Sequence, residues 1–118
     1  MPLPTPTPTE YFFSTEGCYI TELSNSDADP ALSIAQARVT PGTSTAWHRL
    51  AHTTERYCIV SGEGIAEVGD AAPVRVQAGD VIIIRPEERQ RITNTGEMDL
   101  IFLAICTPRF AMSNYQSA

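Results

Sequence analysis

The stretch that decides the expected fold is PGTSTAWHRLAHTTERYCIVSG, residues 41–62 of the 118-residue chain. Turn-forming Pro and Gly residues bound it, and its second half is rich in apolar side chains. Side chains two positions apart on a strand point to the same face. Glu55, Tyr57 and Ile59 therefore share a face that passes from a polar to an apolar end. Closed barrels line ligand cavities with such faces.

The same rule gives His48 and Leu50 a common face, and likewise Gln90 and Ile92. A carboxylate inside a small barrel is costly to desolvate unless a cation or hydrogen-bond donors accompany it. Glu55 next to His48 thus favours a functional site. The alternative is a hydrogen-bonded polar pair that only satisfies the barrel interior.

Outward from this stretch, the chain reads as short strands separated by turn residues, without helical periodicity. Gly62 to Gly64, lying between two apolar segments, predicts a hairpin. About eight to ten strands at regular spacing predict an all-β sandwich or barrel. The clearest strand candidates are residues 18–23, 32–39, 56–61, 65–68, 81–84 and 100–106.

Composition divides the chain into three parts. Residues 1–9 alternate Pro and Thr and are expected to form a flexible, extended arm. Residues 10–108 are expected to form the β-barrel domain, and residues 109–118 a C-terminal tail. A chain of this size fits one compact domain.

The charges exclude several classes of function. All eight basic residues are arginines, so a Schiff-base lysine and a Walker-type phosphate loop are excluded. The net charge of −6 disfavours binding to nucleic acid or an anionic membrane. Three scattered cysteines form no metal or disulfide pattern. No secretory signal or membrane span is present in the sequence, and we expect a cytoplasmic protein.

Four residues stand at the spacing of a known motif. Gly42, His48, Glu55 and Gly62 resemble the first conserved motif of the cupin family, and Leu50 occupies the position of that motif's second histidine. The resemblance covers most of the expected domain, because a second motif follows at the proper separation.

The second cupin motif is altered in its chemistry. Gly79 and Asn94 stand where the family has them, but Gln90 replaces the histidine of this motif. Arg85 and Glu87 replace its proline and its second glycine. The frame of the motif is therefore similar, while two of the family's four metal ligands, both histidines, are missing.

The resemblance implies a double-stranded β-helix, or jelly-roll barrel, that is often dimeric and holds one metal ion. It implies a ligand set of His48, Glu55 and Gln90 for a divalent ion such as Mn, Fe, Ni or Zn, with Glu55, His48 and Tyr57 as catalytic candidates. One interpretation is a metal-dependent enzyme for a small molecule, of isomerase, cyclase or dioxygenase type. A metal-free cupin that binds or senses a small ligand is the second, and a structural module is the third.

Two expectations concern the surroundings of this site. His52 is either a spare ligand folded back from a turn or a histidine that faces solvent. Open sheet edges, together with the aromatic residues Tyr11, Phe12 and Phe13, favour a homodimer that covers them.

Overall fold

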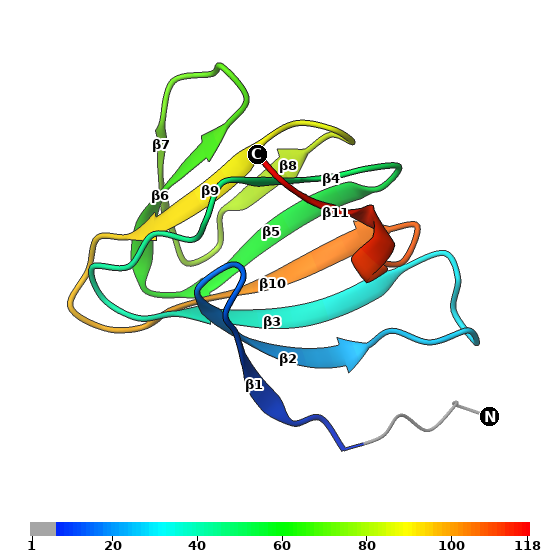
Figure 1. Ribbon diagram of the computed structural model, residues 1–118. Helices are drawn as coiled ribbons and strands as arrows, with labels where there is room; N and C mark the ends of the chain where they lie inside the picture. The colour runs from blue at the N-terminus through cyan, green and yellow to red at the C-terminus, as the bar shows by residue number, and fades with distance from the viewer. Residues whose placement is uncertain (1–6) are drawn as a thin grey trace.

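The computed structural model describes residues 7–118, which form eleven strands and one short 3-10 helix. The all-β prediction is confirmed, because the strands form two antiparallel sheets that face each other as a double-stranded β-helix (Figure 1). The elements are β1 (Glu10–Phe13), β2 (Cys18–Ser24), β3 (Ser33–Val39), β4 (His48–Leu50), β5 (Thr54–Ser61), β6 (Glu63–Val68), β7 (Val74–Gln77), β8 (Val81–Ile84), β9 (Gln90–Asn94), β10 (Leu100–Thr107), η1 (Met112–Asn114) and β11 (Tyr115–Ser117).

The two sheets contain strands from distant parts of the chain. One sheet has six strands in the order β1-β2-β3-β10-β5-β8, and the other has five in the order β11-β4-β9-β6-β7. Successive strands often change sheet, as β3 and β4, β5 and β6, and β9 and β10 do. This topology pairs β9, which begins at Gln90, with β4, which begins at His48, although the two strands lie far apart in sequence. Glu55 lies on β5, which follows β4 in the chain but belongs to the opposite sheet.

The predicted hairpin at Gly62 is wrong. β5 pairs with β10 and β8, whereas β6 pairs with β7 and β9, so the chain passes from one sheet to the other at this glycine. Gly62 has φ +86°, and a Cβ there would lie 2.6 Å from the carbonyl oxygen of Asp99. The connection from β5 to β6 passes close to the connection from β9 to β10 at this point, and only glycine fits between them.

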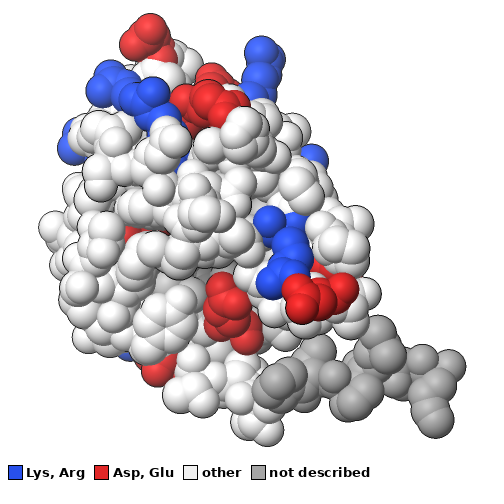
Figure 2. Space-filling model, turned by 45° about the vertical axis from the view of Figure 1, so that its right-hand side comes forward, with Lys and Arg blue, Asp and Glu red and all other residues white. Residues whose placement is uncertain are grey.

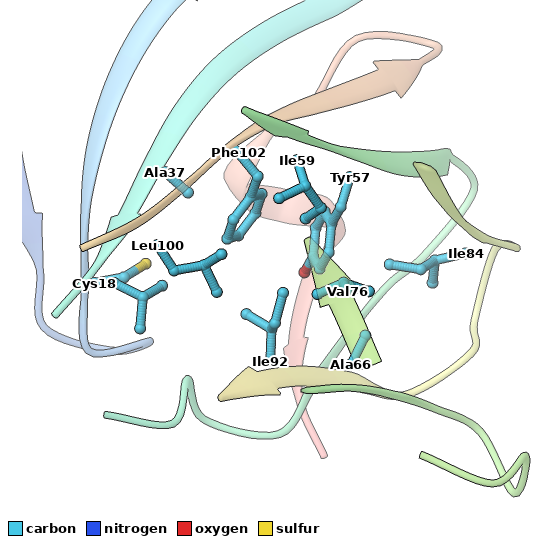
Figure 3. Packing of buried hydrophobic residues seen from close by; sticks show 11 residues of the cluster. Cys18, Ala37, Tyr57, Ile59, Ala66, Val76, Ile84, Ile92, Leu100 and Phe102 are labelled. Carbon is cyan, nitrogen blue, oxygen red and sulfur yellow. The ribbon is translucent and has the colours of Figure 1, made fainter. Parts of the chain in front are cut away.

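The apolar core lies between the sheets (Figure 3). Tyr57 and Ile59 of β5 and Phe102 of β10 face Ile92 and Val76 of the opposite sheet. The ring centroids of Tyr57 and Phe102 are 4.4 Å apart. Burying one such large apolar side chain contributes roughly 1.5–3 kcal/mol to stability. The alternation of buried and less buried side chains that we expected for residues 55–59 is therefore present in β5.

Both ends of the described chain add strands that the sequence did not predict. β1 forms the outer edge of the six-stranded sheet, and β11 pairs with β4 at the edge of the other. The segment 109–118, which we expected as a tail, thus packs against the barrel of its own chain (Figure 1). Most of the expected arm, residues 1–6, lies outside the described residues, and residues 7–9 are exposed.

Figure 2 shows one face of the molecule, on which charged side chains gather at the upper edge and to the right of the centre, with acidic side chains also near the lower centre. Across residues 7–118, no helix combines the length and the apolar character needed to cross a membrane.

Candidate functional site

His48, at the start of β4, is held in a fixed orientation. Its side chain is buried, and Nδ1 lies 2.7 Å from the carbonyl oxygen of Ala46. A carbonyl only accepts, so Nδ1 carries the proton and donates it, and Nε2 of the neutral ring keeps its lone pair. Burial lowers the pKa of His48 below its usual value, which favours this neutral form.

Nε2 of His48 faces a carboxyl group that the sequence did not single out. Glu16, in the turn between β1 and β2, places Oε1 3.4 Å from this nitrogen. The carbonyl oxygen of Glu16 also accepts a 2.9 Å hydrogen bond from the amide of Ala46, which fixes the turn against β4. Burial raises the pKa of the Glu16 carboxyl to about 7.

Glu55, near the start of β5, is the second buried carboxyl group. Burial, followed by the charge of Glu16, raises its pKa to about 7, while the neighbouring His48 opposes the rise. Its Oε1 is buried without a hydrogen-bond partner among the described residues. Two carboxyl groups of raised pKa thus flank one imidazole, a composition suited to exchanging protons near neutral pH.

Gln90 and Tyr57 lie deeper in the barrel. Gln90 is the cross-strand partner of His48, and its Oε1 accepts a hydrogen bond from the hydroxyl of Tyr57. The Nε2 of Gln90 is buried without a partner within residues 7–118. Burial raises the pKa of Tyr57 well above its usual value, so the phenol stays protonated and remains the donor.

His48, Glu55 and Glu16 line a cavity of about 70 Å³ at one end of the barrel. Gln90 and Tyr57 are not among its lining residues. Its wall includes apolar side chains from both chain ends and from β4, and three of its lining residues are acidic while none is an arginine. The residues that line it are Tyr11, Phe13, Glu16, Ile20, Glu22, Ser33, Ile34, Ala35, His48, Leu50, Glu55, Ala104, Cys106, Phe110, Met112 and Tyr115.

Three further side chains have clear places. Leu50 is buried and lines the cavity on the same strand as His48, so an apolar group fills the position of the family's second histidine. His52 is exposed in a turn, with φ +64° and its amide bonded to Glu87. Cys106 lines the cavity, but burial raises its pKa to about 12, so it is not a thiolate at neutral pH.

Sequence reasoning did not find two of the side chains around His48. Glu16 lies in a turn with no motif around it, and Tyr115 lies in the expected tail. Tyr115 stacks on the imidazole of His48, with centroids 5.1 Å apart and planes 12° apart. Only the pairing of β11 with β4 brings this ring to the site, and no local sequence signal predicts that pairing.

The predicted metal ligands fit a divalent ion only in part. The lone pair of His48 Nε2 and the unpartnered Oε1 of Glu55 suit such an ion. Gln90 does not fit well, because it does not line the cavity and its oxygen accepts a hydrogen bond from Tyr57, while its unpartnered atom is a nitrogen that cannot ligate. Among residues 7–118, no three His, Cys, Asp or Glu side chains are grouped to hold a metal ion.

Residues 35–106 match the family described as the Cupin domain. This stretch is more than half of the chain and contains both motifs, and it joins β3 through β10. The chain therefore belongs to the cupin family.

Similar proteins include small-molecule binders and enzymes. An oxalate-binding protein of Thermotoga maritima is 37% identical over 71 residues, which cover 60% of this chain and 58% of that protein, less than two thirds of its length. A predicted oxalate decarboxylase from the same organism is 29% identical, with a TM-score of 0.74 over 86% of this chain and 92% of that chain. A nucleoside dehydratase of Streptomyces shares the fold at 18% identity, with a TM-score of 0.77 over 98% and 92% of the two chains.

Proposed function

We propose that this cupin binds a small, oxygen-rich organic molecule of the oxalate type in the cavity that His48, Glu55 and Glu16 line. The observation that carries the proposal is the buried Oε1 of Glu55, which lacks a partner within the described chain and lines the same cavity as a neutral imidazole. Buried polar atoms normally have partners, so such an atom marks a place for a bound group. The name of the oxalate-binding relative supports this ligand class.

The same residues supply acid–base chemistry to a bound molecule. His48 Nε2 accepts a proton in its neutral form, and the carboxyl groups of Glu16 and Glu55 hold or release one near pH 7. Tyr57 acts indirectly in this scheme, because its hydroxyl fixes the amide of Gln90 next to β4. The reaction class that this arrangement favours is proton transfer at a carbon or oxygen of the ligand.

Charge restricts how an acid enters this cavity. Three acidic side chains and no arginine line it, so a dianion is repelled while the carboxyl groups are ionised. Protonation of Glu16 and Glu55 below about pH 7 removes most of this repulsion. We therefore expect an anionic ligand to bind more tightly at pH 5.5 than at pH 8 in the absence of metal.

A divalent ion is the second candidate, favoured by the acidic lining and the free lone pair of His48. His48 and Glu55 are the two side chains that would hold it, and Glu16 is the nearest additional carboxyl group. The ion would supply positive charge that attracts an acid into the cavity. Elemental analysis of protein purified without added metal tests this candidate. About one ion per chain would favour the metal-bound form over the metal-free form.

The test of the proposal is calorimetric titration with oxalate at pH 5.5, with and without Mn²⁺. We expect His48→Ala and Glu55→Ala to weaken binding at least ~10-fold, or ~1.4 kcal/mol, because each removes a polar side chain that lines the cavity. His52→Ala is the matched control, since His52 is exposed in a turn. Wild-type affinity in folded His48→Ala and Glu55→Ala would refute the site.

A further inference from the structure

Tyr115 is a second aromatic ring of the cavity, and its place follows from β11. The cross-strand pair of Tyr115 and Leu50 sets this side chain beside β4. Its ring stacks on His48, and Phe13 packs edge-on against the Tyr115 ring, with the two centroids 5.5 Å apart. Contacts on two sides hold the phenol in one position against the imidazole.

The hydroxyl of Tyr115 is buried and has no hydrogen-bond partner within residues 7–118. Burial raises the pKa of this phenol above its usual value, so it stays a hydrogen-bond donor throughout the neutral range. Glu55, whose Oε1 also lacks a partner among the described residues, lines the same cavity. A buried phenol normally has a hydrogen-bond partner, and packing of the ring alone does not require the oxygen.

The size of the cavity limits what such a partner can be. A cavity needs roughly 10–15 Å³ for each water-sized group, so about 70 Å³ holds about five to seven non-hydrogen atoms. An acid of two or three carbons fits this space completely. A molecule as large as a nucleoside would have to extend through the apolar rim near Phe110 and Met112.

We propose that the hydroxyl of Tyr115 donates a hydrogen bond to an oxygen of the bound molecule and selects small carboxylic or hydroxycarboxylic acids of two or three carbons. This inference rests on the proposed function, since it names a contact in the same cavity. It assigns the C-terminal strand a direct part in ligand selection. Tyr115 thereby supplies a neutral donor in a cavity whose other polar groups are mainly carboxyl groups.

The test compares two phenol-to-phenyl substitutions that each remove one oxygen atom. Tyr115→Phe removes the buried hydroxyl, and Tyr19→Phe is the control, because Tyr19 is not among the residues that line the cavity. Oxalate and glycolate are titrated into each protein by calorimetry at pH 5.5, with and without Mn²⁺. The melting temperature of each ligand-free protein is measured in the same buffer.

We expect Tyr115→Phe to weaken binding of both acids at least 10-fold, with Tyr19→Phe unchanged. The ligand-free melting temperature of Tyr115→Phe should stay the same or rise, because an unpaired buried oxygen is removed. A lower melting temperature with unchanged affinity would give the hydroxyl a structural role and overturn the inference. Failure of the wild-type protein to bind either acid would instead overturn the proposed function, and this assignment with it.

Discussion

Glu16 and Glu55 connect the site to the stability of the fold. Burial raises the pKa of each carboxyl group from 4.5 to about 7, so between these values the folded chain binds protons that the unfolded chain releases. This contribution is present in full below pH 4.5 and is lost as pH rises through 7. We expect the free energy of unfolding to fall by ~1–3 kcal/mol per carboxyl group between pH 5 and pH 7.5, measured by urea denaturation.

Glu16→Gln isolates one of these carboxyl groups. His48 acts in the opposite direction, because burial lowers its pKa and its contribution is lost as pH falls. Both proteins keep His48, so its effect largely cancels in the comparison. The free energy of unfolding of Glu16→Gln should depend less steeply on pH than that of wild type. Equal slopes would show that Glu16 ionises normally in the folded chain.

A substitution at Leu50 tests directly whether the missing second histidine limits metal binding. It is 4% exposed, lines the cavity and shares a strand face with His48. We expect Leu50→His to raise the affinity for Ni²⁺ or Zn²⁺ at least ~10-fold, or ~1.4 kcal/mol, by adding a strong donor. Calorimetric metal titration of the folded variant measures this change. Unchanged affinity would mean that β4 presents no metal site and would favour the metal-free proposal.

At the scale of elements, Gly62 controls the crossing from β5 to β6. Gly62→Ala places a methyl group against the Asp99 carbonyl, whereas Gly79→Ala, also at positive φ, meets nothing within 4 Å. Left-handed backbone costs an alanine roughly 1–2 kcal/mol at either position. We expect Gly62→Ala to lower the free energy of unfolding by at least ~2 kcal/mol more than Gly79→Ala. Equal losses in urea denaturation would show that the crossing relaxes easily.

The elements that the sequence predicted are those with strong local signals. The β-branched run of β8 and the apolar run of β10 appear at the expected residues, and so does the buried alternation of β5. β7, β1 and β11 were missed because each is short and lacks the uninterrupted β-branched run that marks the equally short β8, so that each depends on pairing with a neighbour. The false hairpin at Gly62 has the same origin, since local turn chemistry does not tell which sheet the next strand joins.

The site was predictable to a similar extent. Motif spacing and strand parity identified His48 and Glu55, which line the cavity, and Gln90, which pairs with His48. The remaining contacts of the site were not predicted. The hydroxyl of Tyr57 donates a hydrogen bond to Gln90, and Glu16 approaches His48 from the turn between β1 and β2. Such contacts depend on how loops and terminal strands close over the barrel, and a single sequence has no periodic signal for them.

For the whole molecule, we expect a homodimer that covers the exposed apolar edge of β8. Ile83 and Val81 on this edge strand are 65% and 55% exposed, and Val60 on neighbouring β5 is 49% exposed. Exposed edges and apolar patches of this kind are normally covered in stable proteins. Light scattering at micromolar concentration should therefore give about twice the chain mass of 12.9 kDa.

Ile83→Glu locates this interface. The substitution puts a charge in the centre of the patch and should shift the measured mass toward that of the monomer. Met98→Glu is the control, because Met98 is 72% exposed in the loop between β9 and β10. A monomeric wild type would contradict the dimer, and a dimer unaffected by Ile83→Glu would place the contact elsewhere, as on Tyr11 and Phe12 of β1.

Two neighbours of His48 lie outside the stretch that matches the family. Glu16 precedes residues 35–106 and Tyr115 follows them, yet both contact the imidazole. Relatives could therefore inherit the same barrel and acquire different ligands by exchanging only their terminal segments. A chimera that keeps residues 35–106 and takes both ends from a relative should fold around the same core while its ligand preference follows the donor of the ends. Changes in ligand specificity would then arise in the terminal segments of the chain before they arise in the two motifs.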